Sequence, residues 1–309
     1  MEYLKDPGSP DQFIQKAQSL IFPRTEPVWW GSVSKDSWTH EYQRDGCYLF
    51  PQLLSPLPVK FWSDCCHHLK LGNFPGQILE SQSSTLRSQF NVHHLAPELV
   101  RRLIVPLLID IATSILGGDP QIYQCHINFK SARQGEAYDW HSDFTYWKSH
   151  DGMISPRAIS VVFPLNLHGP KNGGIEVLRK SHRWYYLNQL HRHHQWQLDQ
   201  VRHEPSGNRQ QKGLVPEELL NLSEFSTDRW APDMKCGDIF IMDANLWHQS
   251  PPNLSNLDRT TLFLILISPE TEFESEDYFY RPPYISCRQR LPLRHFCNQN
   301  SLPDTLTTR

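Results

Sequence analysis

The stretch QIYQCHINFKSARQGEAYDWHSDF, at residues 121–144, contains two short β-like runs separated by a polar connection. Similar runs follow along the chain, and clusters of Gly, Pro and Asn such as HGPKNGG (168–174) lie between them. These later runs are RAISVVFPLN (157–166), GIEVL (174–178), DIFIMD (238–243) and TTLFLILIS (260–268). Many short strands with turn signals between them predict a sandwich or a barrel.

The residues ahead of this region have a different pattern. Residues 56–71 (PLPVKFWSDCCHHLKL) and residues 97–116 carry apolar side chains at helical spacing. Residues 1–40 are rich in Pro, Ser and Trp, which predicts an irregular N-terminal arm leading into a helix. Helices ahead of a strand-rich region predict an α+β fold, and we expect one domain spanning residues 1–309.

A polar segment at residues 185–231 interrupts the strands. It contains HRHHQWQ (191–197) and SGNRQQKG (206–213), and it is long for a simple connection. Its histidines could suggest a metal site, but a solvated loop explains the composition more simply. We expect a mobile lid insertion here, with a disordered connection as the alternative.

Composition and charge exclude several classes of protein. The net charge of −3 and the pI of 6.6 provide no basic field for nucleic acid or an anionic membrane. The first twenty residues lack the apolar run of a secretory signal, and the longest apolar stretches are too short for a membrane helix. The seven cysteines show no CxxC pair and no disulfide-framework spacing. We therefore expect a cytoplasmic protein with reduced thiols.

Three features of the strand-rich region carry chemistry, and each is weak alone. His141 and Asp143 are two residues apart, so on a strand their side chains would point to the same face. A motif this short is expected by chance in a chain with 16 His and 33 acidic residues. His248 follows a β-run and a Gly-Asp turn, where a structural role is the common alternative. Arg259 opens an apolar strand, which is costly unless the guanidinium meets an anion or a local carboxylate.

Together these features fit one kind of site. Two histidines and one carboxylate form the facial triad that holds Fe(II) and leaves positions open. Two open positions suit the chelating end of a 2-oxo acid, and the third suits O2. A fixed arginine such as Arg259 can then bind the remote carboxylate of 2-oxoglutarate through two hydrogen bonds. The order of these residues along the chain is much more specific than any one of them.

The chain also resembles the phytanoyl-CoA dioxygenase family and, within it, the ectoine hydroxylases. The resemblance spans nearly the whole chain and is closest at WHSDFTYWKSHDGMISPRAIS (140–160). Other similar stretches are DGCYLFPQLLS (45–55), LRSQFNVHHL (86–95), YQCHINFK (123–130), NGGIEVLRKSHRW (172–184), GDIFIMDANLWHQS (237–250), RTTLFLILIS (259–268) and YRPPYISCR (280–288).

The resemblance implies a double-stranded β-helix of the jelly-roll, cupin-like kind, with flanking N-terminal helices. It implies an enzyme that uses Fe(II), 2-oxoglutarate and O2, and it implies a role for several residues. Those are His141, Asp143 and His248 as iron ligands, and Arg259, Asn128 and Lys130 as 2-oxoglutarate-binding residues.

Positions that would contact the substrate depart from the ectoine hydroxylases. His126 stands where those enzymes carry Arg, and Thr145-Tyr146 stands where they carry Glu-Thr. The candidate substrate-binding residues are Gln124, His126, Tyr146, Trp147 and Arg281. They favour a small polar, amino-acid-like substrate such as an ectoine-like or mycosporine-like compound, which would be hydroxylated or oxidatively N-dealkylated. A long acyl-CoA is disfavoured, because no basic cluster for its phosphates is visible.

Two other classes remain as alternatives. One is a non-catalytic jelly-roll protein that binds a ligand, and the other is a different metal-dependent enzyme on a cupin-like barrel. Neither needs both the triad and Arg259 at these spacings. The expected partner is a small-molecule substrate, and a homodimer is one possible assembly.

Overall fold

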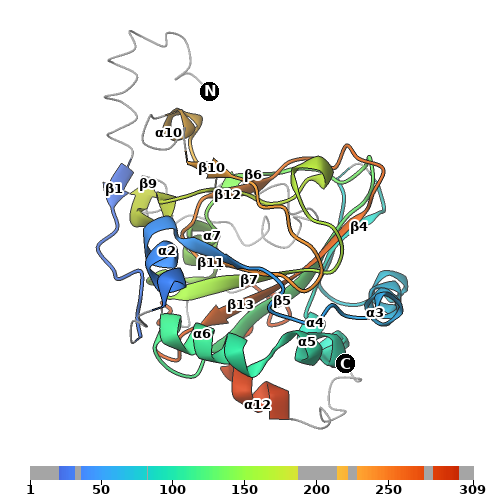
Figure 1. Ribbon diagram of the computed structural model, residues 1–309, viewed down its shortest axis with the longest axis horizontal. Helices are drawn as coiled ribbons and strands as arrows, with labels where there is room; N and C mark the ends of the chain where they lie inside the picture. Colours follow the sequence, from blue (N-terminus) through green and yellow to red (C-terminus); the bar gives the residue numbers. More distant parts are fainter. Residues whose placement is uncertain are drawn as a thin grey trace.

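The computed structural model of the chain describes residues 21–31, 36–81, 83–186, 214–221, 228–274 and 281–298. Their strands form a larger and a smaller antiparallel sheet that face each other (Figure 1). The order in the major sheet is β2 (Cys47–Phe50), β11 (Ile239–Asp243), β7 (Ala158–Pro164), β13 (Arg259–Ile267), β5 (Gln121–Lys130), β4 (Leu86–Phe90) and β3 (Gln77–Leu79), with β14 (Leu291–Pro292) beside β5. The order in the minor sheet is β10 (Arg229–Trp230), β8 (Glu176–Leu178), β12 (His248–Ser250) and β6 (Tyr138–His141). This arrangement is the expected jelly roll.

The central strands of the major sheet are buried on both faces. On β13, Leu262 and Leu264 pack toward the helices, whereas Phe263 and Ile265 pack into the space between the two sheets. Successive side chains of a strand point to opposite faces, so both sets of side chains leave water. This explains why these strands appear in the sequence as continuous apolar runs instead of alternating ones.

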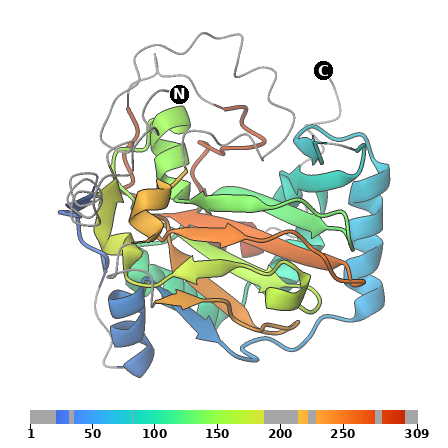
Figure 2. The same cartoon turned by 90° about the horizontal axis from the view of Figure 1, so that it is seen from above.

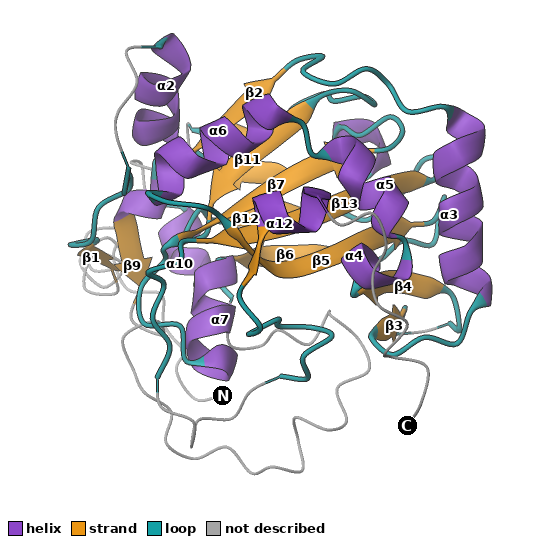
Figure 3. Cartoon of the chain, turned by 90° about the horizontal axis from the view of Figure 1, so that it is seen from below, coloured by secondary structure: helices purple, strands orange, loops and turns teal. Residues whose placement is uncertain are grey.

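Helices cover the outer face of the major sheet, as Figure 3 shows. They are α4 (Val92–Leu95), α5 (Pro97–Leu103), α6 (Pro106–Leu116) and α12 (Leu293–Asn298), with α3 (Val59–Leu71) at the side where β4 and β3 end the sheet and α2 (Ser37–Asp45) ahead of β2. The predicted helix at 97–116 is interrupted. Val105 has the extended conformation (φ −102°, ψ 157°) because it precedes Pro106, which also lacks an amide hydrogen.

The remaining elements lie around the minor sheet (Figure 2). They are α7 (Asp143–Asp151), α10 (Glu217–Leu220), a small sheet of β1 (Ile21–Pro23) and β9 (Trp184–Tyr186), and two 3-10 turns at Pro170–Asn172 and Ser181–Arg183. Within the described part of the chain, no helix combines the length and the apolar character of a membrane span. All seven cysteines are free.

Parts of two predicted segments lie outside the described residues. Residues 1–20 of the N-terminal arm lie outside the described residues. In the described part of the arm, β1 pairs with β9 and Trp29 is buried in the core. Of the predicted lid at 185–231, residues 187–213, with the histidine cluster, and residues 222–227 lie outside. The single domain and the mobile lid therefore stay predictions.

Candidate active site

Three side chains that can hold a metal ion meet at the minor sheet. His141 ends β6, His248 begins β12, and these two residues lie opposite each other in the antiparallel pair. Nε2 of His141 lies 3.7 Å and Nε2 of His248 lies 3.9 Å from Oδ1 of Asp143. The ligand atoms of the three residues all lie within 4.8 Å of one another.

The position of Asp143 differs from the expectation that it shares a strand with His141. The strand ends at His141, Ser142 is the N-cap of α7, and Asp143 is the first residue of that helix. The Ser142 hydroxyl accepts a hydrogen bond from the Thr145 amide, which is the usual role of a capping serine. His141 and Asp143 therefore converge because the chain turns from a strand into a helix between them, and not because alternate residues of one strand share a face.

Hydrogen bonds orient each of these side chains. Nδ1 of His141 donates to the carbonyl of Asp139 at 2.6 Å, and Nδ1 of His248 donates to the carbonyl of Leu246 at 2.9 Å. Each Nε2 lone pair is thereby left for a metal ion, because Nδ1 carries the proton. Burial and the neighbouring His248 lower the pKa of His141 to about 4, so the neutral form that binds metals prevails at neutral pH.

Arg259 lies in the same interior, at the start of β13. Its side chain is buried, and its Nε has no hydrogen-bond partner among the described residues. The described residues also provide no carboxylate within ion-pair distance of it. Burial lowers the pKa of Arg259 to about 10, so the guanidinium still carries its charge at neutral pH. A buried, charged and unpaired cation is a strong attractor for an anion.

Asn128 and Lys130 lie on β5, which pairs with β13 so that Lys130 is opposite Arg259. Nζ of Lys130 lies within hydrogen-bond distance of the carbonyls of Ser250 (3.0 Å) and Pro251 (2.5 Å) and of the Ser250 hydroxyl (2.6 Å). Its hydrogen bonds are therefore made within the protein. Burial and the charge of Arg259 lower the pKa of Lys130 to about 5.

The polar group around Asn128 includes two residues that the sequence did not point to. The Ser88 hydroxyl donates to Oδ1 of Asn128 at 2.7 Å and lies 3.0 Å from the Tyr138 hydroxyl. Ser88 is on β4 and Tyr138 is on β6, so the group joins three strands. A lone serine and a lone tyrosine in separate segments carry no sequence signal that would have found them.

Gln124 and His126 share the inner face of β5 with Asn128. Nε2 of Gln124 and Nδ1 of His126 are buried and have no hydrogen-bond partner among the described residues. The His126 ring is stacked between Phe90 and Phe263, with ring centroids 4.7 and 5.0 Å away. Burial, together with the charge of Arg281, lowers the pKa of His126 to about 4 and keeps the ring neutral.

The other three candidate substrate residues gather around Asp151, which the sequence did not single out. Nε and Nη2 of Arg281 donate to the Asp151 carboxylate at 3.0 and 2.5 Å, and the guanidinium lies 4.7 Å from the centre of the Tyr146 ring. The Tyr123 hydroxyl donates to the same carboxylate. Trp147 is buried and packs edge-to-face against Tyr123, and the two ring centres are 5.6 Å apart.

The fold and these side chains define a jelly-roll protein with a candidate metal site of two histidines and one carboxylate. A family model described as phytanoyl-CoA dioxygenase (PhyH) matches residues 42–261. The chain therefore belongs to the phytanoyl-CoA dioxygenase family, and it is a non-haem Fe(II)/2-oxoglutarate-dependent dioxygenase. The predictions of family, fold and enzyme class are confirmed.

Individual relatives cover nearly the whole chain. An ectoine dioxygenase of Sphingopyxis alaskensis is 26% identical over 307 residues, which cover 94% of this chain and 97% of the relative. An L-proline trans-4-hydroxylase of Streptomyces griseoviridis is 27% identical over 254 residues, covering 82% and 92%. A crystal structure of EctD from S. alaskensis with 2-oxoglutarate and 5-hydroxyectoine matches with a TM-score of 0.72 at 26% identity, covering 88% of this chain and 92% of that one.

Proposed function

We propose that His141, Asp143 and His248 hold the Fe(II) ion. The donor set fits this ion, because two neutral imidazoles and one carboxylate on one side leave the other coordination positions open. Oδ2 of Asp143 accepts a hydrogen bond from the Ser160 hydroxyl at 3.1 Å, which leaves Oδ1 toward the two histidines. The iron, when bound, supplies the activation of O2 that an unactivated C–H bond requires.

Arg259 is the residue proposed to bind the remote carboxylate of 2-oxoglutarate. Arg259 is buried without a partner among the described residues, and a bidentate carboxylate would satisfy the guanidinium and neutralise its charge. Thr261 lies two residues after Arg259 on β13, and Asn128 lies opposite Thr261 on β5. The amide nitrogen of Asn128 can donate a hydrogen bond to the same ligand. Lys130 lies opposite Arg259 as a neutral polar group at neutral pH, and its hydrogen bonds tie it to Ser250 and Pro251.

The proposed substrate is a small polar, amino-acid-like metabolite, such as an ectoine-like or mycosporine-like compound. The observation that carries this proposal is the inner face of β5, where Gln124 and His126 present buried polar atoms that have no partner in the described part of the chain. Such atoms cost free energy until a ligand satisfies them, so an apolar acyl chain would be a poor occupant. The names of the relatives, which specify ectoine and L-proline, support the same class.

The proposed reaction consumes the substrate, 2-oxoglutarate and O2, and it yields succinate, CO2 and a hydroxylated product. One oxygen atom enters succinate and the other enters the substrate. Hydroxylation at a carbon that bears nitrogen would give a product that collapses to a free amine and a carbonyl compound, which is oxidative N-dealkylation. Tyr146, Trp147 and Arg281 are proposed to complete the substrate site.

The test is a substrate screen with purified enzyme, Fe(II) and 2-oxoglutarate. Ectoine, L-proline and an imino-mycosporine are each added, and succinate and product mass are measured. For at least one amino-acid-like compound, we expect succinate to form only when that compound is present. The accompanying product should be 16 mass units heavier than the compound, or it should be its dealkylated form. Asp143→Ala is the matched control and should form none. Succinate that depends on an acyl-CoA, and on no amino-acid-like compound, would refute the substrate class.

A further inference from the structure

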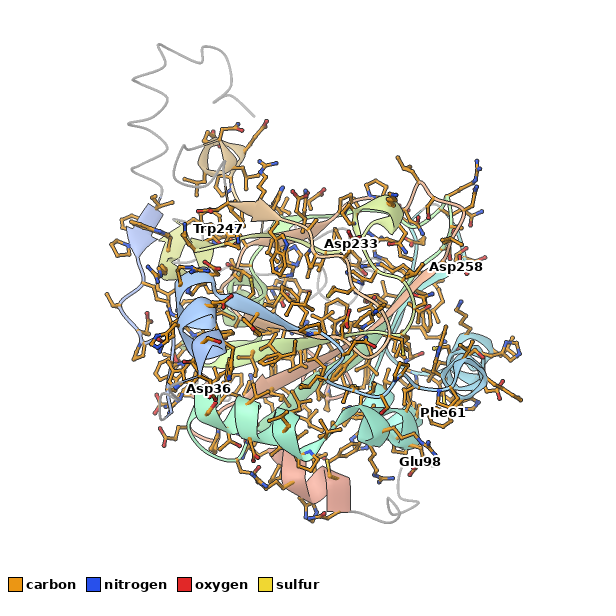
Figure 4. All side chains as sticks on the ribbon, in the orientation of Figure 1. Asp36, Phe61, Glu98, Asp233, Trp247 and Asp258 are labelled. Carbon is orange, nitrogen blue, oxygen red and sulfur yellow. The ribbon has the colours of Figure 1, made fainter. Side chains whose placement is uncertain are left out.

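A buried turn precedes His248 and is hydrogen-bonded to the segment that bears the other two candidate metal ligands. It comprises residues 243–247, between β11 and β12, and its last residue, Trp247 (labelled in Figure 4), precedes His248. Asn245, Leu246 and Trp247 are completely buried. Turns usually lie at the surface, because their backbone groups need hydrogen-bond partners. The partners of this turn therefore show what it supports.

The first set of partners is the segment that contains His141 and Asp143. The Phe144 amide donates to the Ala244 carbonyl at 2.9 Å. The Ser142 hydroxyl donates to Oδ1 of Asn245 at 3.0 Å. Ser142 lies between the two candidate ligands, and Phe144 directly follows Asp143. The turn therefore holds their segment by hydrogen bonds at two positions. The same turn supplies the Leu246 carbonyl that orients His248.

The second set of partners leads to the N-terminal arm. Nδ2 of Asn245 donates to the carbonyls of His182 (3.1 Å) and Trp184 (3.0 Å), and its backbone amide donates to Oδ1 of Asp243 at 2.7 Å. Nη1 of Arg24 donates to both oxygens of the Asp243 carboxylate, at 3.0 and 2.9 Å. The exposed fractions of the Arg24 and Asp243 side chains are only 1% and 3%.

This ion pair is a costly way to obtain stability. Removing two charges from water costs free energy, and apolar side chains of the same volume often stabilise a fold as well or better. Burial raises the pKa of the Asp243 carboxyl, and the charge of Arg24 opposes that rise. The ion pair instead fixes an orientation, because an ionised Asp243 accepts a hydrogen bond from the Asn245 amide in one geometry. Outer partners of this kind set the orientation of metal ligands.

We propose that Arg24 and Asn245 are positioning residues of the metal site, which hold both ligand-bearing segments through the turn at 243–247. The inference rests on the proposed iron ligands. It gives the N-terminal arm a role that its irregular sequence does not suggest. Neither residue belongs to the candidate metal ligands or to the candidate substrate-binding residues.

The test measures metal affinity separately from folding. Fe(II) binding is titrated anaerobically by calorimetry, the visible charge-transfer band of the Fe(II)–2-oxoglutarate complex is recorded, and the apo-protein is melted in EDTA. We expect Asn245→Ala and Arg24→Met to weaken Fe(II) binding about 10- to 100-fold, the range seen for outer partners of metal ligands. The band should shift or broaden, and less product should form per succinate.

Two further variants separate positioning from general loosening. Tyr185→Phe removes the 2.7 Å hydrogen bond from the Tyr185 hydroxyl to Glu26, which anchors the same arm without reaching the turn. It should keep wild-type Fe(II) affinity. If Arg24→Met alone fails to fold, Arg24→Met combined with Asp243→Asn removes the unpaired charge, and it should still bind Fe(II) more weakly.

The outcomes are distinguishable. Wild-type Fe(II) affinity and an unchanged band in Asn245→Ala and in the Arg24 variants would overturn the proposal, as would an equal loss in Tyr185→Phe. His141→Ala tests the underlying site and should abolish stoichiometric binding. If His141→Ala retains wild-type binding, the ligand assignment has failed, and the role of the turn fails with it.

Discussion

Replacing Arg259 by methionine should stabilise the ligand-free protein while abolishing its response to 2-oxoglutarate. Burial lowers the pKa of Arg259 from its ordinary value to about 10, which corresponds to about 3 kcal/mol of free energy. The folded pKa is below the unfolded one, so this cost disappears only as the pH rises through about 10. At neutral pH the guanidinium is charged in both states, and the folded protein carries the whole cost. Methionine removes the charge and fills a similar volume.

The expected gain in unfolding free energy for Arg259→Met is therefore about 2–3 kcal/mol without ligand. The wild-type protein should gain about 2.7 kcal/mol from 2-oxoglutarate at 100 times its Kd, because the ligand binds only the folded state. The variant should gain almost nothing. Chemical denaturation with and without 2-oxoglutarate measures both quantities. Arg294→Met is a matched control, since Arg294 is 52% exposed and should change neither quantity by more than about 0.5 kcal/mol.

Arg259→Lys distinguishes charge from geometry in the same assay. Lysine keeps the charge but loses the two-pronged hydrogen bond, so the KM for 2-oxoglutarate should rise about 10- to 100-fold with a smaller effect on the other substrate. Two results would refute the reasoning. One is an Arg259→Met protein that is less stable without ligand yet keeps the wild-type gain from 2-oxoglutarate. The other is an Arg259→Lys protein whose only change is in the KM of the other substrate.

Three further predictions follow from the site and its surroundings. Alanine at any one of the three metal ligands should abolish Fe(II) binding and turnover while the apo-protein keeps its circular dichroism spectrum; wild-type turnover in one of them would contradict the triad. His126→Arg should lower turnover of the substrate at least about tenfold, because a charge replaces a neutral ring, but leave uncoupled succinate formation and Fe(II) affinity near wild type; losing all three together would mean misfolding. Burial lowers the pKa of His93 and of His182 to about 3, so these histidines take up protons at a higher pH in the unfolded chain than in the folded one. The free energy of unfolding in EDTA should therefore fall by about 1.4 kcal/mol per pH unit for each histidine as the pH drops below about 6.5. Equilibrium unfolding at pH 7 and 5 tests this, and His93→Leu should show a shallower fall than the wild-type protein.

The sequence by itself determined the class of fold and pointed to the candidate metal ligands and Arg259. The run at 121–130 is β5, and the run predicted at 260–268 is β13 shifted by one residue. These strands could be recognised because they are buried on both faces, so their apolar character is continuous and their ends are marked by polar turns. His141, Asp143, His248 and Arg259 could be recognised because their order and spacing are unusual together.

Only the tertiary structure decided how these residues meet. Asp143 reaches the histidines from a strand-to-helix corner, and the helix at 97–116 breaks before Pro106. The partners that hold the site, such as Ser160, Asn245 and Arg24, come from segments far apart in the chain. A hydrogen bond between such segments depends on their register in the fold. It leaves no periodicity or spacing in the sequence, because each partner is a single polar residue whose significance comes only from what lies opposite it.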